Sequence, residues 1–426
     1  MDDDPAVEPE LDTFSLLLPL PYRVALIIVL GVWAWGANLQ YLSQLGIDVP
    51  ALIRYPSRTS HTAPTHALST HRLAILLTLP LLASLLLFWT LTQLSPSLVL
   101  RYELLPASYL LLLLILFVLP TGSFRWLGSL SNGAYKLSHT GRYRTLAVLK
   151  RVSVGGLAEP QDGRFGDILM ADVLTSYAKV LGDLFVALCM FFASGKSSTG
   201  MPDRGCGGRV LVPLIIAVPS VIRLRQCLIE FLRVRESNRK MGDDPTRGWG
   251  GQHLANAAKY ASAFPVIILS ALQREKMARG DWIGEVGLYR LWVFSVFLNS
   301  LYSFYWDVAK DWDLTLFSSE NERSDPEHAW GLRRILYFRN PIFYYFVIGL
   351  DLVLRCTWSL KLSPHLDHFN DLEGGIFTIE VLEVFRRWVW VFFRVEAEWL
   401  RNNRGPAPDD VLLGDIHRRD DEDRID

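Results

Sequence analysis

Charged side chains recur inside segments of this chain that are otherwise apolar enough to cross a membrane. An ionisable group at the bilayer centre costs about 2.5–3.5 kcal/mol on insertion scales, so several of them require a shared polar interior. Arginine presents a planar fork of donors that fits the oxygens of phosphate or carboxylate, and lysine adds a compact cation. The cations concerned are Lys259, Arg355, Arg386 and Arg387. Their chemistry predicts a binding site for a small oxyanion, with inorganic phosphate as the simplest candidate.

Acidic and hydroxyl side chains accompany these cations at helical spacing. In segment 168–192 the polar residues recur at steps of three and four, which predicts a single polar helix face. They are Asp172, Thr175, Ser176, Lys179 and Asp183. A second stripe contains Ser300, Ser303, Asp307 and Asp311. Two pairs have the favourable acid-first order, namely Asp351 with Arg355 and Glu383 with Arg387. We expect the carboxylates to orient the arginines and to weaken anion binding enough for release.

Two other interpretations of these charges remain open at this point. Intramembrane ion pairs can lock helices together without contributing to transport. Asp307 and Asp311 can alternatively bind a coupling cation or a proton. Matched polar stripes on several helices favour a common polar cavity over isolated pairs.

The elements that must position these residues are membrane helices. Half of the 426 residues are hydrophobic and only 20% are charged. A bilayer core about 30 Å thick needs about 20 apolar helical residues, and about nine such windows occur. They lie near 24–41, 73–94, 104–119, 168–192, 210–228, 254–272, 289–306, 342–360 and 376–393. The predicted fold is therefore an all-α polytopic membrane protein whose last six helices form a polar-cored bundle.

The predicted organisation has five parts. They are an acidic N-terminal segment (1–23), three apolar transmembrane helices (24–121), a basic cytoplasmic loop (122–164), a six-helix transport domain (165–400) and a charged cytoplasmic tail (401–426). The opening MDDDPAVEPELD lacks the basic region of a cleavable signal peptide, so internal helices are expected to direct insertion. Basic residues follow the odd-numbered spans, which places the N-terminus in a lumen and the C-terminus in the cytoplasm.

Several other residue types are expected to be inert. The four cysteines are far apart without a CxxC spacing, so we expect packing roles rather than a zinc site or a disulfide framework. SGKSS at 194–198 lacks the first glycine of a nucleotide-binding loop, because Met190 stands there. His61, His66 and His71 are expected in a solvated loop, and His365 and His368 at a lumenal surface. No metal, no cofactor and no hydrolytic nucleophile is predicted.

The chain resembles the EXS family, which includes phosphate exporters and a shorter Golgi branch concerned with ER retention. The resemblance covers about residues 165–400 and is carried by ordered segments. These are FGDILMADVLTS, PSVIRLRQCLIEFLRVRES, HLANAAKYASAF, LNSLYSFYWDVAKDWDL, LDLVLRCTWSL and LEVFRRWVWVFFRVEAEWL. A weaker likeness extends upstream through WAWGANLQYLSQLGI. The soluble SPX domain that precedes the membrane region in the larger exporters is expected to be absent, which matches the Golgi branch.

The resemblance implies a set of residues along a phosphate pathway. They are Asp172, Thr175, Lys259, Tyr260, Asp307, Asp311, Arg355, Trp358, Glu383, Arg386 and Arg387. Exporters of the family carry Asn at the position of Thr175, whose hydroxyl can still donate to a phosphate oxygen. Gln226 is expected near the cytoplasmic mouth, with a solvated loop as its alternative.

The resemblance also implies a role and a location. The expected function is phosphate transport from the Golgi lumen to the cytosol, which recycles phosphate released by glycosylation and supports retention of glycosyltransferases and ER residents. Inorganic phosphate and the lipid bilayer are the expected partners. A second copy of the chain, glycosyltransferases and coat adaptors are further candidates, and nucleic acid is not expected. Two competing hypotheses are a sorting factor without transport and a membrane transferase that acts on a phosphorylated lipid.

Overall fold

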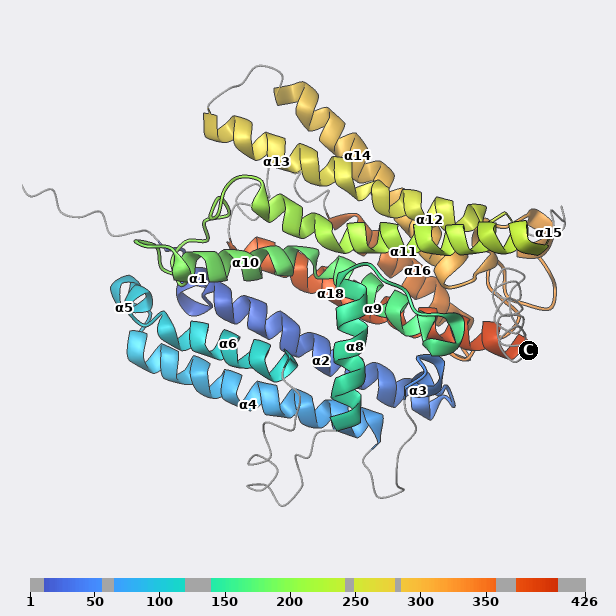
Figure 1. The fold of residues 1–426 in the computed structure, drawn as a ribbon, viewed down its shortest axis with the longest axis horizontal. Helices are drawn as coiled ribbons and strands as arrows, with labels where there is room; N and C mark the ends of the chain where they lie inside the picture. The colour runs from blue at the N-terminus through green and yellow to red at the C-terminus, as the bar shows by residue number, and fades with distance from the viewer. Residues whose placement is uncertain are drawn as a thin grey trace, which may run out of the picture.

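The computed structural model describes residues 11–55, 65–118, 139–241, 249–279, 285–357 and 373–404, and every regular element in these ranges is helical. The longest helices lie roughly along one axis of the molecule (Figure 1). Several predictions fall outside the described residues. They concern Trp358, His61, His365 and His368, the tail beyond residue 404 and positions 122–138 of the basic loop.

Three helices near the N-terminus pack into an apolar layer. They are α2 (Leu20–Gln44), α4 (His66–Thr92) and α6 (Leu104–Val118), with α1 (Thr13–Leu17), α3 (Val49–Leu52) and α5 (Pro96–Arg101) at their ends. Their buried side chains form one cluster that includes Tyr22, Leu77 and Phe88. The outer face of α4 exposes Leu79, Leu82 and Leu86, as a lipid-facing surface should. The exposed side chains on this face of the layer are therefore mainly apolar.

The remaining helices surround a charged interior. They are α8 (His139–Ser153), α9 (Arg164–Ser176), α10 (Ala178–Phe192), α11 (Leu211–Met241), α12 (Gly251–Ala261), α13 (Ala263–Arg279), α14 (Glu285–Trp306), α16 (Pro341–Arg355) and α18 (Glu373–Arg404). Short turns complete the described chain, namely η2 (Pro160–Asp162), η3 (Asp307–Asp311), η4 (Thr315–Phe317) and α15 (Glu320–Arg323). Figure 1 shows α18 running through the middle of the bundle, with α8 crossing it.

Two of these helices are interrupted at a hydroxyl side chain. The α9 and α10 axes are bent by 64°, and Thr175 near the bend donates its hydroxyl to the backbone oxygen of Asp172 at 2.7 Å. Between α12 and α13, Ser262 donates in the same way to the oxygen of Lys259 at 2.6 Å. Such side-chain bonds compete with the helical backbone ladder. Each helix break therefore lies about one turn after a charged residue of the interior, which is Asp172 in α9 and Lys259 in α12.

The number of membrane spans differs from the prediction. The described residues contain four helices that are long and apolar enough to cross a bilayer, or five if the bent pair α9–α10 is one span. The four are Leu20–Gln44, His66–Thr92, Leu211–Lys240 and Gly251–Arg274. The prediction of a multi-pass all-helical membrane protein is confirmed, whereas the count of nine is not. Helices such as α18 carry charged side chains that face the interior of the bundle and not the lipid. Their mean hydropathy is therefore low for helices that are buried.

The bend also overturns the single polar stripe predicted for segment 168–192. Asp172 and Ser176 precede the bend and are buried, whereas Lys179 follows it and is exposed. Asp183 lies further along α10, near Arg204 rather than near Asp172, with a closest N–O distance of 3.6 Å. The stripe was wrong because a continuous helix was assumed across Tyr177.

Two predictions about isolated residue types are also wrong. Cys189 and Cys206 form a disulfide, with Cα atoms 6.1 Å apart, where we had expected only packing roles. His66 and His71 lie within α4 rather than in a solvated loop. His71 faces α2 through a 3.0 Å hydrogen bond between its Nε2 and Oε1 of Gln40. Neither pairing has a local sequence pattern, because each depends on how the helices come together.

The disulfide predicts the number of reactive thiols. Titration of the unfolded chain without reductant should detect two thiols, from Cys227 and Cys356, and reduction should raise that number to four. Cys206→Ser should leave three reactive thiols without reduction, because Cys189 is released. Four thiols in the unreduced wild-type chain would show that Cys189 and Cys206 are not linked.

Candidate anion-binding site

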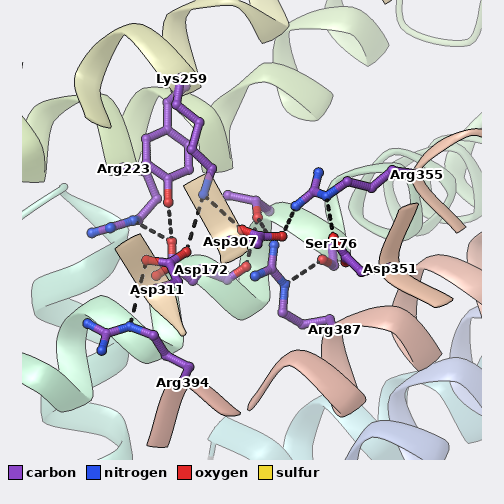
Figure 2. Close-up of polar contacts among 12 residues, drawn as sticks. Asp172, Ser176, Arg223, Lys259, Asp307, Asp311, Asp351, Arg355, Arg387 and Arg394 are labelled. Atoms are coloured by element: carbon purple, nitrogen blue, oxygen red, sulfur yellow. Dashed lines mark hydrogen bonds and ion pairs between the residues drawn. The ribbon is translucent and has the colours of Figure 1, made fainter. Parts of the chain in front are cut away.

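The carboxylate of Asp307 is the centre of the charged interior. It is fully buried and is approached by cations from three helices. Lys259 Nζ of α12 lies 3.3 Å from Oδ1, Arg386 of α18 lies 3.4 Å from Oδ2, and Arg355 of α16 also pairs with Oδ2. Figure 2 shows Asp307 between Lys259 and Arg355. One carboxylate thus fixes the relative positions of three helices.

The backbone around Asp307 widens into a π-helical turn, η3. The N–H of Trp312 donates to the oxygen of Asp307 at 2.8 Å, five residues back. Asp307 and Asp311 contact the same ammonium group, since Lys259 Nζ also lies 3.4 Å from Oδ2 of Asp311. π-turns inside α-helices are frequent at functional sites because they redirect side chains. The fold thus brings together Lys259, Asp307 and Asp311, three of the residues predicted along the pathway.

A second buried group joins α9, α11 and α12. Arg223 Nε lies 2.7 Å from Oδ1 of Asp172, and the hydroxyl of Tyr260 donates to the same carboxylate oxygen. Arg223 also donates to Oε1 of Gln226 at 2.7 Å, and Gln226 donates to the oxygen of Gly156 at 3.0 Å. Gln226 is fully buried, so the solvated-loop alternative for it is wrong. These contacts tie the loop before α9 to the charged interior.

Helix α18 contributes consecutive arginines with different partners. Arg386 donates to Glu383 at 2.6 Å and 2.9 Å and to Asp351 at 3.0 Å. Asp351 also accepts from Arg355 at 3.1 Å, so the expected pair within α16 is present. Glu383 accepts from Ser176 at 2.7 Å. Its helical ion pair is with Arg386, whereas the predicted pairing with Arg387 is absent among the described residues.

Arg387 stands out because it forms no ion pair with any carboxylate of the described residues. Its side chain donates to the hydroxyls of Ser176 at 2.8 Å and Thr175 at 3.3 Å. Its guanidinium lies 4.4 Å from the ring centroid of Trp390. The residue is only 7% exposed. Ser176 links this cation to Glu383, so its charge is compensated only at longer range and a direct anionic ligand is favourable here.

The network continues along α18 beyond the centre. Arg394 Nε lies 3.9 Å from Asp311, and its NH1 group pairs with Glu398 at 2.9 Å. Figure 2 shows Arg394 below Asp311, on the side away from Arg355. The charges therefore form one connected network rather than separate pairs.

Most predicted site residues are brought together by the fold. The network includes Asp172, Thr175, Lys259, Tyr260, Asp307, Asp311, Arg355, Glu383, Arg386 and Arg387. Trp358 lies outside the described residues.

Comparison with known proteins identifies the family. The model of the EXS family matches residues 18–400. The chain belongs to the EXS family. This match begins well before residue 165, so it also includes the apolar N-terminal helices.

This chain covers different shares of the lengths of its relatives. Protein ERD1 homolog 2 of Schizosaccharomyces pombe is 28% identical over 89% of this chain and 96% of its own length. Protein ERD1 homolog 1 of the same yeast is 36% identical over 58% of this chain and 60% of its own length. Solute carrier family 53 member 1 of Homo sapiens is 30% identical over 56% of this chain but only 33% of its own length. The expected similarity to the short branch of the family is thus confirmed.

Two arginines of the charged network, Arg223 and Arg394, were not among the predicted site residues. Arg223 lies three residues before Gln226 inside an apolar segment. A charged residue in such a segment is by itself a candidate for the site. Arg394 lies seven residues after Arg387 and four before Glu398, which places all three on one face of α18. Asp351 and Ser176 were noted for their spacing but were not included in the predicted site.

The contrast between the consecutive arginines predicts different effects on folding. Arg386→Ala leaves Asp307, Asp351 and Glu383 with less compensation and should lower the free energy of unfolding by about 3–5 kcal/mol. Arg387→Ala removes direct hydrogen bonds to hydroxyls and a longer-range attraction to Glu383 and Asp307, but no direct ion pair among the described residues, and should cost about 1–2 kcal/mol. Unfolding of both variants in mixed detergent micelles measures the difference. An equal loss in both would show that Arg387 compensates a buried carboxylate.

Proposed function

We propose that the chain carries inorganic phosphate across the membrane through the network on α18. The observation that supports this most directly is Arg387, a buried fork without a carboxylate partner among the described residues. It lies 14 residues from the start of α18, about 21 Å along the helix, which is near the middle of this 32-residue helix. Glu383 beside it retains 36% exposure of its side chain, so this part of the network is accessible.

The neighbouring groups suit a tetrahedral oxyanion. The hydroxyls of Thr175 and Ser176 can donate to phosphate oxygens, while the guanidinium binds two oxygens at once. The carboxylates already occupy the other arginines, so an incoming phosphate has to compete with Glu383 or Asp351. This competition keeps binding weak enough for release, as conduction requires. We therefore propose transport rather than enzymatic conversion of the ligand.

We also propose that the disulfide end of the molecule faces the Golgi lumen. Disulfides persist in oxidising compartments and are rare in the cytosol. Figure 1 places α1, α5 and α10 at one end of the bundle and α3 and α15 at the other. Cys189 lies in α10, so the oxidising side is the end with α1. This agrees with the lumenal N-terminus predicted from the loop charges.

With this orientation, phosphate released in the lumen would return to the cytosol along its gradient. Retention of glycosyltransferases and ER residents would then depend on lumenal phosphate rather than on direct binding by this chain. The sorting-factor alternative predicts the opposite dependence. A folded variant without flux that still supports retention would favour sorting.

Phosphate flux tests the site. Liposomes that contain the purified chain should take up labelled phosphate, and Arg387→Lys should lower the rate by at least about tenfold because an ammonium lacks the planar fork. Arg334→Lys is the matched control, since Arg334 is 60% exposed and its ion pairs within the described parts of the chain are with Asp325 and Glu327 on a surface loop. The control should retain wild-type flux. Unchanged flux in folded Arg387→Lys would remove Arg387 from the site, and no flux in the wild type would reject transport.

Cysteine accessibility tests the orientation. In a Cys227→Ser/Cys356→Ser background, Glu322→Cys in α15 should react with an impermeant maleimide in sealed Golgi vesicles. Ser97→Cys in α5 should react only after detergent opens the vesicles. Both side chains lie on exposed surfaces at opposite ends of the bundle. The reverse pattern would place the disulfide on the cytosolic side and contradict the proposed direction.

A further inference from the structure

A second group of buried charges lies at the beginning of α18, apart from the network around Asp307. It consists of Arg23 of α2, Asp183 of α10, Arg204 of the α10–α11 loop and Glu373 of α18, and is called here the Arg23–Arg204 cluster. Arg23, Asp183 and Glu373 are 3%, 8% and 7% exposed. The main network makes no use of these residues, although charges buried at this depth are costly unless they have a role.

Two guanidinium groups hold the same carboxylate in this cluster. Arg23 NH1 lies 2.6 Å from Oε2 of Glu373. Arg204 donates to Oε1 at 2.7 Å and to Oε2 at 3.1 Å, which is a bidentate contact. Arg23 is fixed by further bonds to Ser15 Oγ and to the oxygen of Leu18, both at 2.7 Å. The two forks therefore already bind an oxyanion, in the form of the Glu373 side chain.

The loop that carries Arg204 is fastened in place. Cys206, two residues later, is linked to Cys189 of α10. Asp203 accepts from the N–H of Gly205 at 2.8 Å and pairs with Lys196 across the loop. Arg204 retains 24% exposure of its side chain, whereas Arg23 retains 3%. Arg204 is thus the accessible member of the pair, and it is presented by a rigid loop.

Helix α18 connects this cluster to Arg387. Glu373, Glu380 and Arg387 follow one another at steps of seven residues, which places them on one face of the helix. Glu380 is 5% exposed and has no hydrogen bond or ion pair with any described residue. It interacts electrostatically with Asp183, Arg204 and Arg23. Glu380 is thus a buried carboxyl without a close partner among the described residues, and it lies between the Arg23–Arg204 cluster and Arg387. Glu373, Glu380 and Arg387 form a line of polar side chains along this face of α18.

From these contacts we propose that Arg23 and Arg204 form a second phosphate-binding site at the disulfide end of the pathway. Phosphate displaces the Glu373 carboxylate from the accessible Arg204 while Arg23 keeps hold of Glu373. The Glu373 carboxylate competes with phosphate for Arg204 and so limits the affinity, which lets the ion move on toward Arg387. The identity of the ligand rests on the proposed transport of phosphate, whereas the existence of an oxyanion site rests on the cluster alone.

Direct binding of labelled phosphate tests this proposal. The full-length chain is purified in lipid-free detergent, so that no lipid phosphate can occupy the forks. The wild type should bind two phosphates per chain at saturation, Arg204→Gln one, Arg387→Gln one, and the double variant none. Lys196→Gln removes a cation from the same loop outside the cluster, and should still bind two. Two phosphates bound by Arg204→Gln would overturn the second site.

A conservative variant covers the case in which Arg204→Gln does not fold. Arg204→Lys keeps the charge that compensates Glu373 and Asp183 but loses the fork, and should weaken this site by about tenfold. An intact Cys189–Cys206 disulfide and an unchanged elution volume confirm the fold. Wild-type affinity at this site in Arg204→Lys would overturn the bidentate assignment.

Flux measurements separate this proposal from the proposed function. Two bound phosphates without flux in the wild type would reject transport and support the second site. The other outcome is normal flux in the wild type and an Arg204→Gln variant that binds and transports phosphate as the wild type does. That result would reject the second site and leave the proposed transport intact.

Discussion

The desolvated carboxylate of Asp307 constrains the interior more than any other group. A charge removed from water at this depth has to be compensated at close range, because the surrounding helices cannot solvate it. Lys259, Arg355 and Arg386 supply that compensation from α12, α16 and α18. These helices cannot shift independently without leaving at least one charge uncompensated. In the proposed transport, a competing anion would change which cation holds which carboxylate.

Interrupted helices bring these groups to a common depth. The breaks after α9 and α12 each follow one turn after an ionic residue, and both are marked by a hydroxyl that bonds back to that residue's carbonyl. Irregular backbone is tolerated inside a membrane only where it is buried in protein or lines a polar route. The π-turn at Asp307 has the same effect on the opposite side of the site. Charge and broken backbone therefore belong to one arrangement.

Carboxylates have a second role as internal competitors for the arginines. Glu383 occupies Arg386, and Glu373 occupies Arg23 and Arg204. A site that holds its own anionic side chain avoids the cost of unpaired buried cations, and under the proposed function it would also keep phosphate from binding too tightly. Arg387 differs, since only hydroxyls and the Trp390 ring contact it among the described residues. This difference between adjacent residues of one helix is the basis for proposing that Arg386 has a structural role and that Arg387 binds the ligand.

Local sequence was enough to determine the helical membrane character, the residue types of the site and most of its members. Apolar runs interrupted by charge admit few other interpretations, because lipid does not tolerate isolated ions. Ion pairs four residues apart, such as Asp351 with Arg355, also follow from local geometry.

The tertiary structure alone decided the partners that come from distant segments, including Arg223 with Asp172 and the Cys189–Cys206 disulfide. It also decided that Asp183 belongs with Arg204 rather than with Asp172, because a bend at Tyr177 rotates one half of the segment away from the other. Helical periodicity describes a face only while the helix is continuous, and neither the bend nor the packing of separate helices is encoded in that period.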